Sequence, residues 1–420
     1  MRSLNVDVAV VGAGPAGCAA ATLLAQHGHD VALFEREPGP RYHVGESLLP
    51  MCRGVLDRMG AVEAIEGAAF QRKDGVRFVR ADGRPSQPFY FASHLQGPEA
   101  ATWQVDRERF DEVLLRRAAE CGVKVYRGHE ATALQENDGV VTGLKVTHQE
   151  GHEVSATARW VVDASGRDGL SMRQYRWRNA ERALNRVAVW GYYSGGTRAA
   201  GRDEGATTVC SLATGGWIWH IPLANDMTSV GVVARVDQFE GELQDREQAY
   251  QSAIAAQPWV QEQLRVASRV GELRLTRNYS YFGARTGKPG LLLCGDAFAF
   301  LDPVFSSGMY IALTSGGMTA DLIHRSLAGD LPHDEVESAY EDWLTTHIEP
   351  MRRLIHAFYD PAFSVGSLVR ERPDLRGDLT DILVGNLDRD FTELMAELGE
   401  RTRLPAPLSD RLANREDACE

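Results

Sequence analysis

The sequence has few of the features that mark secreted, metal-binding, nucleic-acid-binding or membrane-spanning proteins. Its six cysteines form no CxxC pair and no repeated spacing, so we expect neither a disulfide framework nor a metal site, and we expect a reducing cytoplasm. The net charge of -13 argues against a surface for nucleic acid or anionic membranes. No apolar run approaches the roughly 18 residues of a membrane helix, and the chain begins with a strand-like run rather than a signal peptide.

What the sequence does contain is an ordinary globular composition. Its 420 residues are 44% hydrophobic and 25% charged, which suffices for two or three packed units around a large core. No internal repeat is visible. Function therefore has to be inferred from motifs and their spacing.

The first part of the chain carries the pattern of a nucleotide-binding βαβ unit. An apolar run at 6–11 predicts a buried parallel strand, a helix is expected over 15–27, and a second strand follows over 30–34. The sequence GAGPAG joins the first strand to the helix. Because this glycine-rich turn lies in the required strand–turn–helix context, it predicts dinucleotide binding.

Each residue type in that turn has a physical role. Gly12 makes the tight turn, Gly14 lets a pyrophosphate approach the helix N-terminus, and Gly17 allows close helix–strand packing. Glu35 ends the second strand, where it can accept hydrogen bonds from ribose hydroxyls. We therefore expect cofactor contacts from Gly12, Gly14, Ala16, Gly17, Glu35 and Arg36.

Two further corners place an acid at the end of an apolar strand. The run WVV before Asp163 predicts a buried strand that ends in a small-residue turn, and the run at 291–294 leads into Gly295 and Asp296. A helix is expected from about Met309 onward, so that the N–H groups of Ser307, Gly308 and Met309 could bind an anion. Taken alone, this last stretch is equally typical of a plain strand–loop–helix connection.

Alternating strands fill residues 186–235, and helical patterns dominate after Pro332. The sequence thus predicts an α/β fold: a Rossmann-like domain over 1–180 and 275–335, an inserted antiparallel β-sheet domain over 181–274, and a C-terminal helical region over 336–420. Residues 76–102 are expected to contribute to the substrate side. We also expect two helices over 244–269, broken before Pro258, separate helices over 334–347 and 350–359, and a polar, frayed tail over 404–420.

Three features of the sequence have two interpretations each. Lys73 lies in a strand-like stretch, where a lysine is usually a solvated surface charge. Trp217 and Trp219 are two apart and so face the same side of their strand, but paired indoles often belong to a core. Gly45-Glu46-Ser47 could be a surface loop or could lie along a bound ring system.

A family resemblance bears on all of these residues. The Gly-rich turn with Glu35, the Asp163 corner and the Gly295-Asp296 corner resemble the FAD-binding fold of the p-hydroxybenzoate hydroxylase type. Within it the chain resembles a flavin-dependent halogenase, by the motifs WIWHIP at 217–222, HVGESLLP at 43–50, FLDPVFSSG at 300–308 and FQRKDG around Lys73. The tryptophan motif and the lysine are fairly specific, whereas the other two motifs also occur in relatives that do not halogenate.

The resemblance implies a reaction and a set of roles. FAD, used as FADH2, would react with dioxygen and oxidise chloride or bromide to hypohalous acid, which Lys73 would hold or convert to a haloamine. The halide would bind at Ser307 and Gly308, and Trp217, Trp219 and Phe305 would face the substrate. Further cofactor contacts implied by the family are Gly45, Glu46, Ser47, Arg107, Asp163, Gly295, Asp296, Pro303, Gly308 and Met309.

The resemblance also implies partners and leaves alternatives open. No second glycine-rich fingerprint for NADPH is visible, so a separate flavin reductase is expected to supply FADH2. Tryptophan halogenases carry a glutamate in PLESTG where this chain has Phe305, so we expect a phenol or pyrrole substrate, free or on an acyl carrier protein. The alternatives are an aromatic hydroxylase, a reductase of the geranylgeranyl reductase kind, and a flavin-binding protein without turnover.

Overall fold

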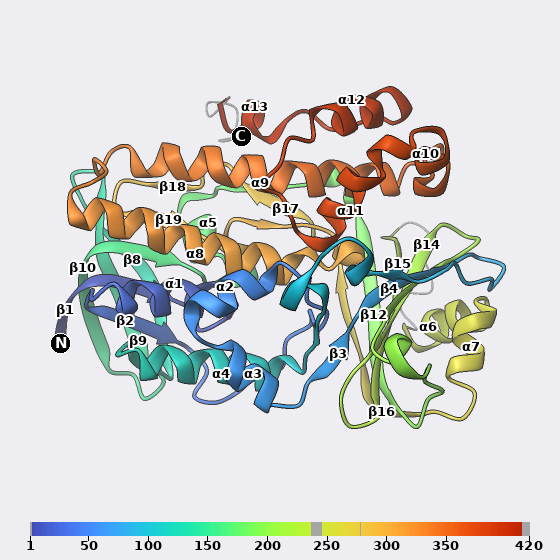
Figure 1. The fold of residues 1–420 in the computed structure, drawn as a ribbon. Coiled ribbons are helices and arrows are strands. Elements are labelled where there is room, and N and C mark those ends of the chain that lie inside the picture. The colour runs from blue at the N-terminus through green and yellow to red at the C-terminus, as the bar shows by residue number, and fades with distance from the viewer. Residues whose placement is uncertain (1, 237–245, 278, 414–420) are drawn as a thin grey trace.

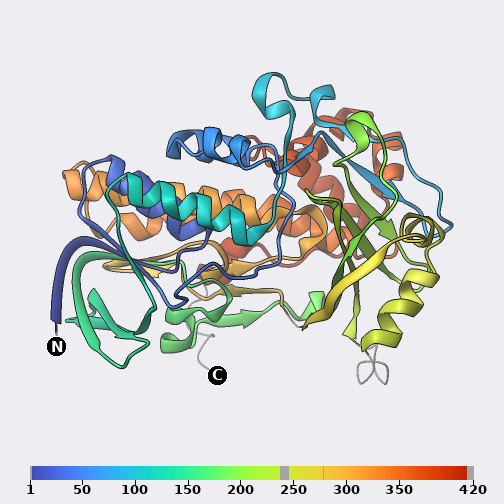
Figure 2. The same cartoon turned by 90° about the horizontal axis from the view of Figure 1, so that it is seen from below.

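The computed structural model describes residues 2–236, 246–277 and 279–413. Two large sheets lie side by side, and long helices cover the sheet that contains the N-terminus (Figures 1 and 2). The protein is thus an α/β fold, as the sequence predicts.

The first sheet has eight strands and a parallel centre. The apolar run at the N-terminus forms β1 (Arg2–Val11), which pairs in parallel with β2 (Val31–Glu35) and with β10 (Glu153–Asp163). Its central order is β18-β19-β10-β1-β2-β7, with β9 added antiparallel to β10 and β8 beyond it. The remaining strands of this sheet are β7 (Lys124–Arg127), β8 (His129–Asn137), β9 (Val140–His148), β18 (Gly287–Lys288) and β19 (Leu291–Leu293).

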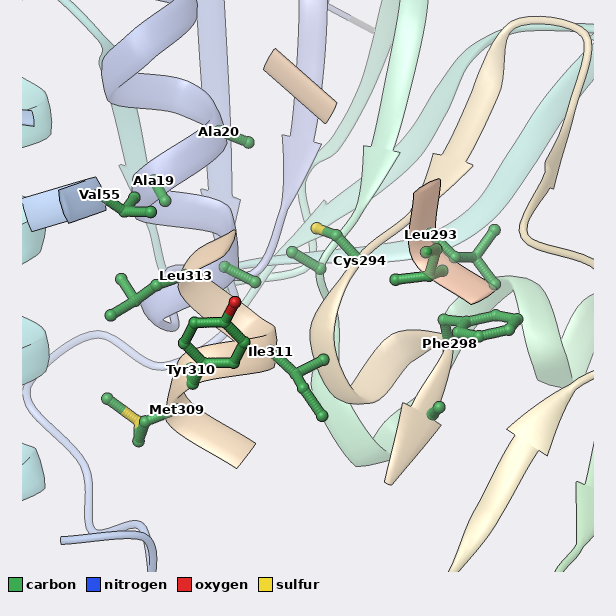
Figure 3. Packing of buried hydrophobic residues seen from close by; sticks show 14 of the residues in the cluster. Ala19, Ala20, Val55, Leu293, Cys294, Phe298, Met309, Tyr310, Ile311 and Leu313 are labelled. Carbon is green, nitrogen blue, oxygen red and sulfur yellow. The ribbon is translucent and has the colours of Figure 1, made fainter. Parts of the chain in front are cut away.

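Helices bury one face of this parallel sheet. The helix α1 (Pro15–Gln26) packs against α8 (Ser307–Ala328) and α4 (Arg107–Glu120). Figure 3 shows Ala19 and Ala20 on α1, Leu313 on α8, and Leu293 and Cys294 at the end of β19 among the buried hydrophobic residues of this region. The small residues of α1 let the two helices approach closely, which fixes the N-termini of both helices at the same edge of the sheet.

The second sheet has seven strands in the order β16-β12-β15-β14-β13-β4-β5. It is antiparallel except for one pair: β4 runs parallel to β13, with Val76 opposite Thr207. The helices α6 (Arg246–Ala255) and α7 (Pro258–Gln263) pack on it, divided before Pro258 as expected, but the chain is already in a strand from Ser268 rather than helical to 269. The strands are β4 (Gly75–Val79), β5 (Phe89–Tyr90), β12 (Arg186–Ser194), β13 (Thr207–Ser211), β14 (Gly216–Pro222), β15 (Met227–Arg235) and β16 (Ser268–Arg277).

Short elements join the two sheets. A two-stranded ribbon pairs β3 (Gln71–Lys73) with β6 (Thr102–Gln104), and a small sheet has the order β11-β17-β20. The small sheet consists of β11 (Arg178–Ala180), β17 (Tyr281–Gly283) and β20 (Ala299–Phe300). Nearby helices are α2 (Cys52–Met59), α3 (Val62–Gly67), α5 (Leu170–Tyr175) and the 3-10 turns η1 (Phe91–Ser93), η8 (Gly295–Ala297) and η9 (Pro303–Phe305).

The C-terminal region differs from expectation at one proline. A single helix, α9 (Val336–Phe358), runs through Pro350, where the sequence predicts two helices. Proline removes one backbone hydrogen bond, but Leu344, Ile348 and Met351 are buried on both sides of it. Packing of this continuous apolar stripe outweighs the local preference for a break.

The rest of the C-terminal region is helical, and no helix among the described residues is long and apolar enough to cross a membrane. The tail is ordered further than predicted, because Leu408 and Leu412 of the last helix are buried. Residues 414–420 of the predicted frayed tail, and 244–245 of the predicted helical stretch, lie outside the described residues. The helices are α10 (Val365–Glu371), α11 (Arg376–Val384), α12 (Thr392–Arg401) and α13 (Leu408–Ala413).

Candidate functional site

A cavity of about 580 Å³ lies between the two large sheets. Its walls come from both sheets and from the N-termini of α1 and α8. Thirteen of the predicted site residues line it: Gly14, Ala16, Arg36, Gly45, Glu46, Ser47, Arg107, Trp217, Trp219, Asp296, Pro303, Gly308 and Met309. The predicted residues outside the lining are Gly12, Gly17, Glu35, Lys73, Asp163, Gly295, Phe305 and Ser307.

The glycine-rich turn closes one end of the cavity. A Cβ atom on Gly12 would lie 2.4 Å from the Ala164 carbonyl oxygen, and one on Gly17 would lie 1.9 Å from the Gly12 oxygen. A Cβ on Gly14 would meet no atom within 4 Å. The first two glycines are therefore required by the fold, whereas the space above Gly14 is free for a ligand at the N-terminus of α1.

Charged residues surround this end. Glu35 is buried and accepts hydrogen bonds from the backbone N–H groups of Ala13 (2.9 Å) and Glu37 (3.0 Å), with Arg41 3.6 Å away. Arg36 reaches into the cavity and pairs with Asp168 at 2.5 Å. The arginines that line this region are Arg36, Arg41, Arg107, Arg167 and Arg178, a cationic set that suits a pyrophosphate.

The two acidic corners differ in what their carboxylates contact. Asp163 is fully buried and accepts from Ser165 N (3.0 Å), Ser165 Oγ (2.5 Å) and Ser171 N (2.7 Å), which holds the following turn against the Gly12 loop. Asp296 instead faces the cavity, and burial raises its pKa to about 6 despite Arg167 and Arg107 nearby. Gly295, beside it, adopts a φ of +59° and packs against Ala16 of α1.

The 43–50 loop crosses the middle of the cavity. Arg107 anchors it by donating to the Val44 carbonyl oxygen at 2.9 Å while forming a two-bond contact with Asp111. Glu46 is buried, and its Oε1 accepts from the Tyr192 hydroxyl at 2.5 Å. Burial raises the Glu46 pKa to about 7. The carboxyl group is therefore placed to hold or release a proton near neutral pH.

That carboxyl group belongs to a buried network of aromatic hydrogen-bond donors. The Tyr192 hydroxyl lies 2.7 Å from the Tyr42 hydroxyl, and Trp190 Nε1 donates to Tyr42 at 2.6 Å. Burial raises the pKa of Tyr42 to about 12, so both phenols stay protonated. These three aromatic residues were not predicted from the sequence, because nothing local around Tyr42 or in the strand AVWGYYSG indicates which side chains meet the 43–50 loop.

The tryptophan pair forms a wall of the cavity. Trp217 and Trp219 are buried with ring centroids 5.9 Å apart. Trp219 Nε1 donates to Ser229 Oγ at 3.1 Å, and Trp217 Nε1 donates to the Tyr359 hydroxyl, just past α9, at 2.7 Å. A hydrogen bond thus links the tryptophan wall to the C-terminal end of α9.

Asp302 is a further buried carboxyl group at the cavity, and it was not among the predicted site residues. It lines the cavity and accepts from the hydroxyls of Tyr359 (2.9 Å) and Tyr279 (3.2 Å) and from Val304 N (3.0 Å). Burial raises its pKa to about 6. Asp302 lies within the motif FLDPVFSSG, so the sequence could have drawn attention to it. Its hydrogen-bond partners Tyr279 and Tyr359 come from distant elements, which the sequence does not indicate.

The N-terminus of α8 lies at the cavity. Gly308, Met309 and Pro303 line it, whereas Ser307 is buried behind them with its Oγ in contact with no hydrogen-bond partner. Phe305 is also buried and packs edge-on against Phe358 of α9 at 5.6 Å. The first backbone N–H groups of α8 therefore face the cavity with the positive end of the helix dipole behind them.

Lys73 is not a surface charge. It is fully buried on β3, and its Nζ donates to Ser47 Oγ at 2.8 Å and to the Leu48 carbonyl oxygen at 2.9 Å. The third side of the ammonium faces the Phe91 ring, 5.5 Å from the centroid. Burial lowers the Lys73 pKa to about 7, and among the described residues it forms no ion pair.

Comparison with known proteins agrees with this architecture. A family model described as tryptophan halogenase matches residues 92–363, and one for FAD-dependent oxidoreductases matches residues 7–173. The chain belongs to the flavin-dependent tryptophan halogenase family. It is 36% identical to a tryptophan 2-halogenase of Chondromyces crocatus over 361 residues, which cover 85% of this chain and 68% of that protein.

Solved halogenase structures share the whole fold. The myxobacterial chondrochloren halogenase CndH is 31% identical with a TM-score of 0.81, over 94% of this chain and 96% of that one. The flavin-dependent brominase Bmp2 is 27% identical with a TM-score of 0.84, over 94% and 98% of the two chains. This halogenase-family protein is therefore an FAD-dependent enzyme, and the open space above Gly14 with its arginine-rich surroundings fits the cofactor.

Proposed function

We propose that this protein is a halogenase that uses FADH2, dioxygen and chloride or bromide to halogenate an electron-rich aromatic compound. The observation that carries the proposal is the environment of Lys73. Its amine is fully buried, has no counter-ion among the described residues, and donates a hydrogen bond to Ser47, which lines the cofactor cavity. Burying an unpaired ammonium is costly, so a fold that keeps one has a use for it. Bound FADH2 supplies the reducing equivalents for dioxygen, and with them the oxidising power for halide oxidation.

The nucleotide end of the cavity would hold the ADP portion of FAD. Gly14 leaves room for the pyrophosphate, the arginines around it balance the phosphate charge, and Glu35 orders the loop at the ribose side. Asp296 faces the space where the ribityl chain would lie. The 43–50 loop would run along the flavin ring.

The N-terminus of α8 would bind the halide. Among the described residues, the N-cap position of this 22-residue helix makes no side-chain capping hydrogen bond, which leaves the first backbone N–H groups, including those of Ser307 and Gly308, for an anion. The apolar side chains of Val304 and Met309 line the cavity beside them. The tryptophan wall would separate the substrate from the flavin, which disfavours direct hydroxylation.

Lys73 would receive the hypohalous acid. A neutral amine can take the halogen as a haloamine, with water leaving, and an ammonium can hold the acid by hydrogen bonding. Because its pKa lies at about 7, Lys73 can adopt either form at physiological pH. Arginine could not replace it, since a guanidinium stays protonated.

Phenols or pyrroles, free or presented on a carrier protein, are the proposed substrates. Phe305 packs against Phe358 where the tryptophan enzymes place a carboxylate, so the wall offers no charge at that position to stabilise substitution on indole. Tryptophan is the second candidate, favoured by the name of the 36%-identical relative from Chondromyces crocatus. A separate flavin reductase in a reducing cytoplasm would supply FADH2, in keeping with the five free cysteines of the described residues.

The test is to measure flavin reoxidation and halogenated product together in lysine variants. Lys73→Ala should retain FAD binding and oxygen-dependent reoxidation but lose at least about 100-fold in product, as expected when a positioned proton donor or acceptor is removed. Lys73→Arg should fail in the same way. Lys145→Ala, an exposed lysine, is the matched control and should behave like the wild type.

Substrates should be screened with bromide and chloride over phenols, pyrroles and indoles by mass spectrometry. Oxygenated rather than halogenated products would favour the aromatic hydroxylase alternative. Wild-type product yield from Lys73→Ala would remove the main support for the proposal.

A further inference from the structure

Lys73 is close to the cofactor cavity but does not line it. Of the two groups that accept hydrogen bonds from its amine, the Leu48 carbonyl belongs to the loop backbone behind the cavity and Ser47 belongs to the cavity wall. The amine itself is fully buried beneath Phe91. Any proton that moves between Lys73 and the cavity therefore has its shortest polar path through the Ser47 hydroxyl.

A second hydroxyl continues this path. Ser47 Oγ lies 2.9 Å from Thr207 Oγ1, and Thr207 also lines the cavity. Gln104, which is fully buried, donates from Nε2 to Thr207 Oγ1 at 2.8 Å and to the Gly205 carbonyl oxygen at 2.9 Å. The parallel β4–β13 pair and the β3–β6 ribbon bring Thr207, Gln104 and Lys73 together from three distant parts of the chain.

Donor and acceptor counting gives this chain of groups a direction. When Lys73 is an ammonium it donates to Ser47, so the Ser47 hydrogen must point to Thr207. Thr207 then accepts from both Ser47 and Gln104, and its own hydrogen is left for the cavity. When Lys73 is a neutral amine with a lone pair, both hydroxyls can turn and donate toward it.

We propose that Ser47 and Thr207 are positioning residues that form a two-hydroxyl relay, which moves a proton between the buried amine of Lys73 and the flavin cavity. The inference rests on the proposed halogenase function for its purpose, although the relay itself is a property of the folded protein. No electron transfer is involved: one N–H bond of Lys73 breaks, and each hydroxyl passes on one proton and receives another.

The surroundings of the amine favour such an exchange. From α2, the titratable group that faces Lys73 is the Cys52 thiol, whose own pKa is raised to about 12 by burial. From η1, the Phe91 ring faces the amine, with its centroid 5.5 Å from Lys73 Nζ. Burial holds the Lys73 pKa near 7, so the charged and neutral amine are close in free energy and a path for the proton decides how fast they interconvert.

The relay matters for halogen transfer because the two amine forms react differently. A neutral Lys73 amine forms the N–halogen bond as the oxygen–halogen bond of hypohalous acid breaks, and the displaced oxygen leaves as water with one amine hydrogen. Transfer of the halogen to the substrate requires a proton to return to the nitrogen. Because Lys73 is fully buried and Thr207 lines the cavity, the proton that leaves the ammonium beforehand and the proton that returns to the nitrogen pass through Thr207.

The sparse lysine content allows a direct test without flavin, halide or turnover. The chain has four lysines, Lys73, Lys124, Lys145 and Lys288, so protein labelled with 13C-lysine gives four ε-carbon signals by NMR. An ordinary lysine has a pKa of about 10.4, so the Lys73 signal should be the one whose chemical shift changes around neutral pH. The signal that disappears in Lys73→Arg is thereby assigned to Lys73. A relay with fast proton exchange gives one averaged Lys73 signal at its midpoint.

Two variants interrupt the relay at different links. Ser47→Ala should lower the Lys73 midpoint by at least about one pH unit, because the ammonium loses an acceptor. Thr207→Val leaves the Ser47 contact in place, so it should change the midpoint less but broaden or split the signal by slowing exchange. Thr207→Ser restores a hydroxyl and should restore the sharp signal. Thr208→Val, on the opposite face of β13, is the matched control and should match the wild type.

Halogenation then supplies the second readout. The rate of product formation in Thr207→Val should fall about 10-fold, with flavin reoxidation unchanged. This is less than the roughly 100-fold contribution of a positioned proton-transfer group, because Ser47 still forms part of the relay. Thr207→Ser should restore the rate of product formation. The proposal is overturned if Thr207→Val shows the wild-type midpoint, line width and halogenation rate. If the NMR signals change as expected but the protein halogenates none of the compounds, the proposed function is refuted while the proposed relay is supported.

Discussion

The two ends of the cavity are built in different ways. The nucleotide end consists of backbone from one short motif, where Gly12, Gly14 and Gly17 lie within a single turn. The substrate end consists of side chains from separate elements, with Lys73 from β3, Trp217 from β14 and Tyr359 from the end of α9. Backbone sites depend on the space around a few Cα atoms, whereas side-chain sites depend on pairs of groups keeping one another in place.

The largest expected effect tests the nucleotide end with two glycines of the same turn. Gly17→Ala places a Cβ 1.9 Å from the Gly12 carbonyl oxygen, so the helix must shift and we expect little or no folded protein. Gly14→Val meets no protein atom through its Cβ, so we expect a folded protein that has lost at least about 100-fold in FAD affinity, because the side chain occupies the pyrophosphate space. Circular dichroism and flavin titration separate the two results, and a flavin-saturated Gly14→Val protein would contradict this account.

The next largest effect tests the substrate end through pH. Burial lowers the Lys73 pKa to about 7, so the neutral amine is lost as pH falls through 7, and halogenation should fall about tenfold per pH unit below that. Glu46, whose pKa burial raises to about 7, titrates in the same range. Glu46→Gln should lower the rate of halogenation at all pH values, but the fall in that rate below pH 7, the acid limb of the pH profile, should remain. Disappearance of the limb in that variant would assign it to Glu46 instead.

The same contrast explains what could be predicted from sequence. The βαβ unit followed from contiguous residues. The hairpin between β8 and β9 is equally local, since its turn residues Asp138 and Gly139 take positive φ values of 49° and 81°. In such segments the local residue types alone restrict the backbone. The cavity wall formed by GAGPAG needed no information about distant residues.

Contacts between distant residues were not predictable in this way. Nothing near Thr207 indicates that β13 pairs in parallel with β4, or that its hydroxyl meets Ser47, 160 residues away. The Tyr42–Tyr192–Glu46 network and the two phenols on Asp302 have the same origin. The continuity of α9 through Pro350 was missed because burial on both sides of the proline exists only in the folded state.

A smaller effect should appear in the pH dependence of stability at Asp302. Burial raises the pKa of Asp302 from 3.8 to about 6, so the folded protein holds this proton more tightly than the unfolded chain. The stabilisation is complete below about pH 4 and is lost as pH rises through 6. Asp302→Asn does not titrate, so relative to the wild type it should gain roughly 2–3 kcal/mol between pH 4 and 7. Parallel urea unfolding at both pH values measures this, and a pH-independent difference would show that Asp302 ionises normally.

The smallest expected effect concerns the link between the tryptophan wall and α9. Tyr359→Phe removes the hydroxyl that accepts from Trp217 Nε1 and donates to Asp302, but it keeps the aromatic ring against Phe358. The buried indole N–H then lacks its partner, which should cost about 1–3 kcal/mol of stability. Tyr279→Phe removes the other phenol from Asp302 without touching Trp217, so it is the matched control. If the link to α9 holds the wall in place, Tyr359→Phe should release more oxygenated or unselectively halogenated product than Tyr279→Phe at equal flavin reoxidation. Equal product distributions in the two variants would show that the wall keeps its position without the helix, and the substrate end would then depend on fewer side-chain pairs than its construction suggests.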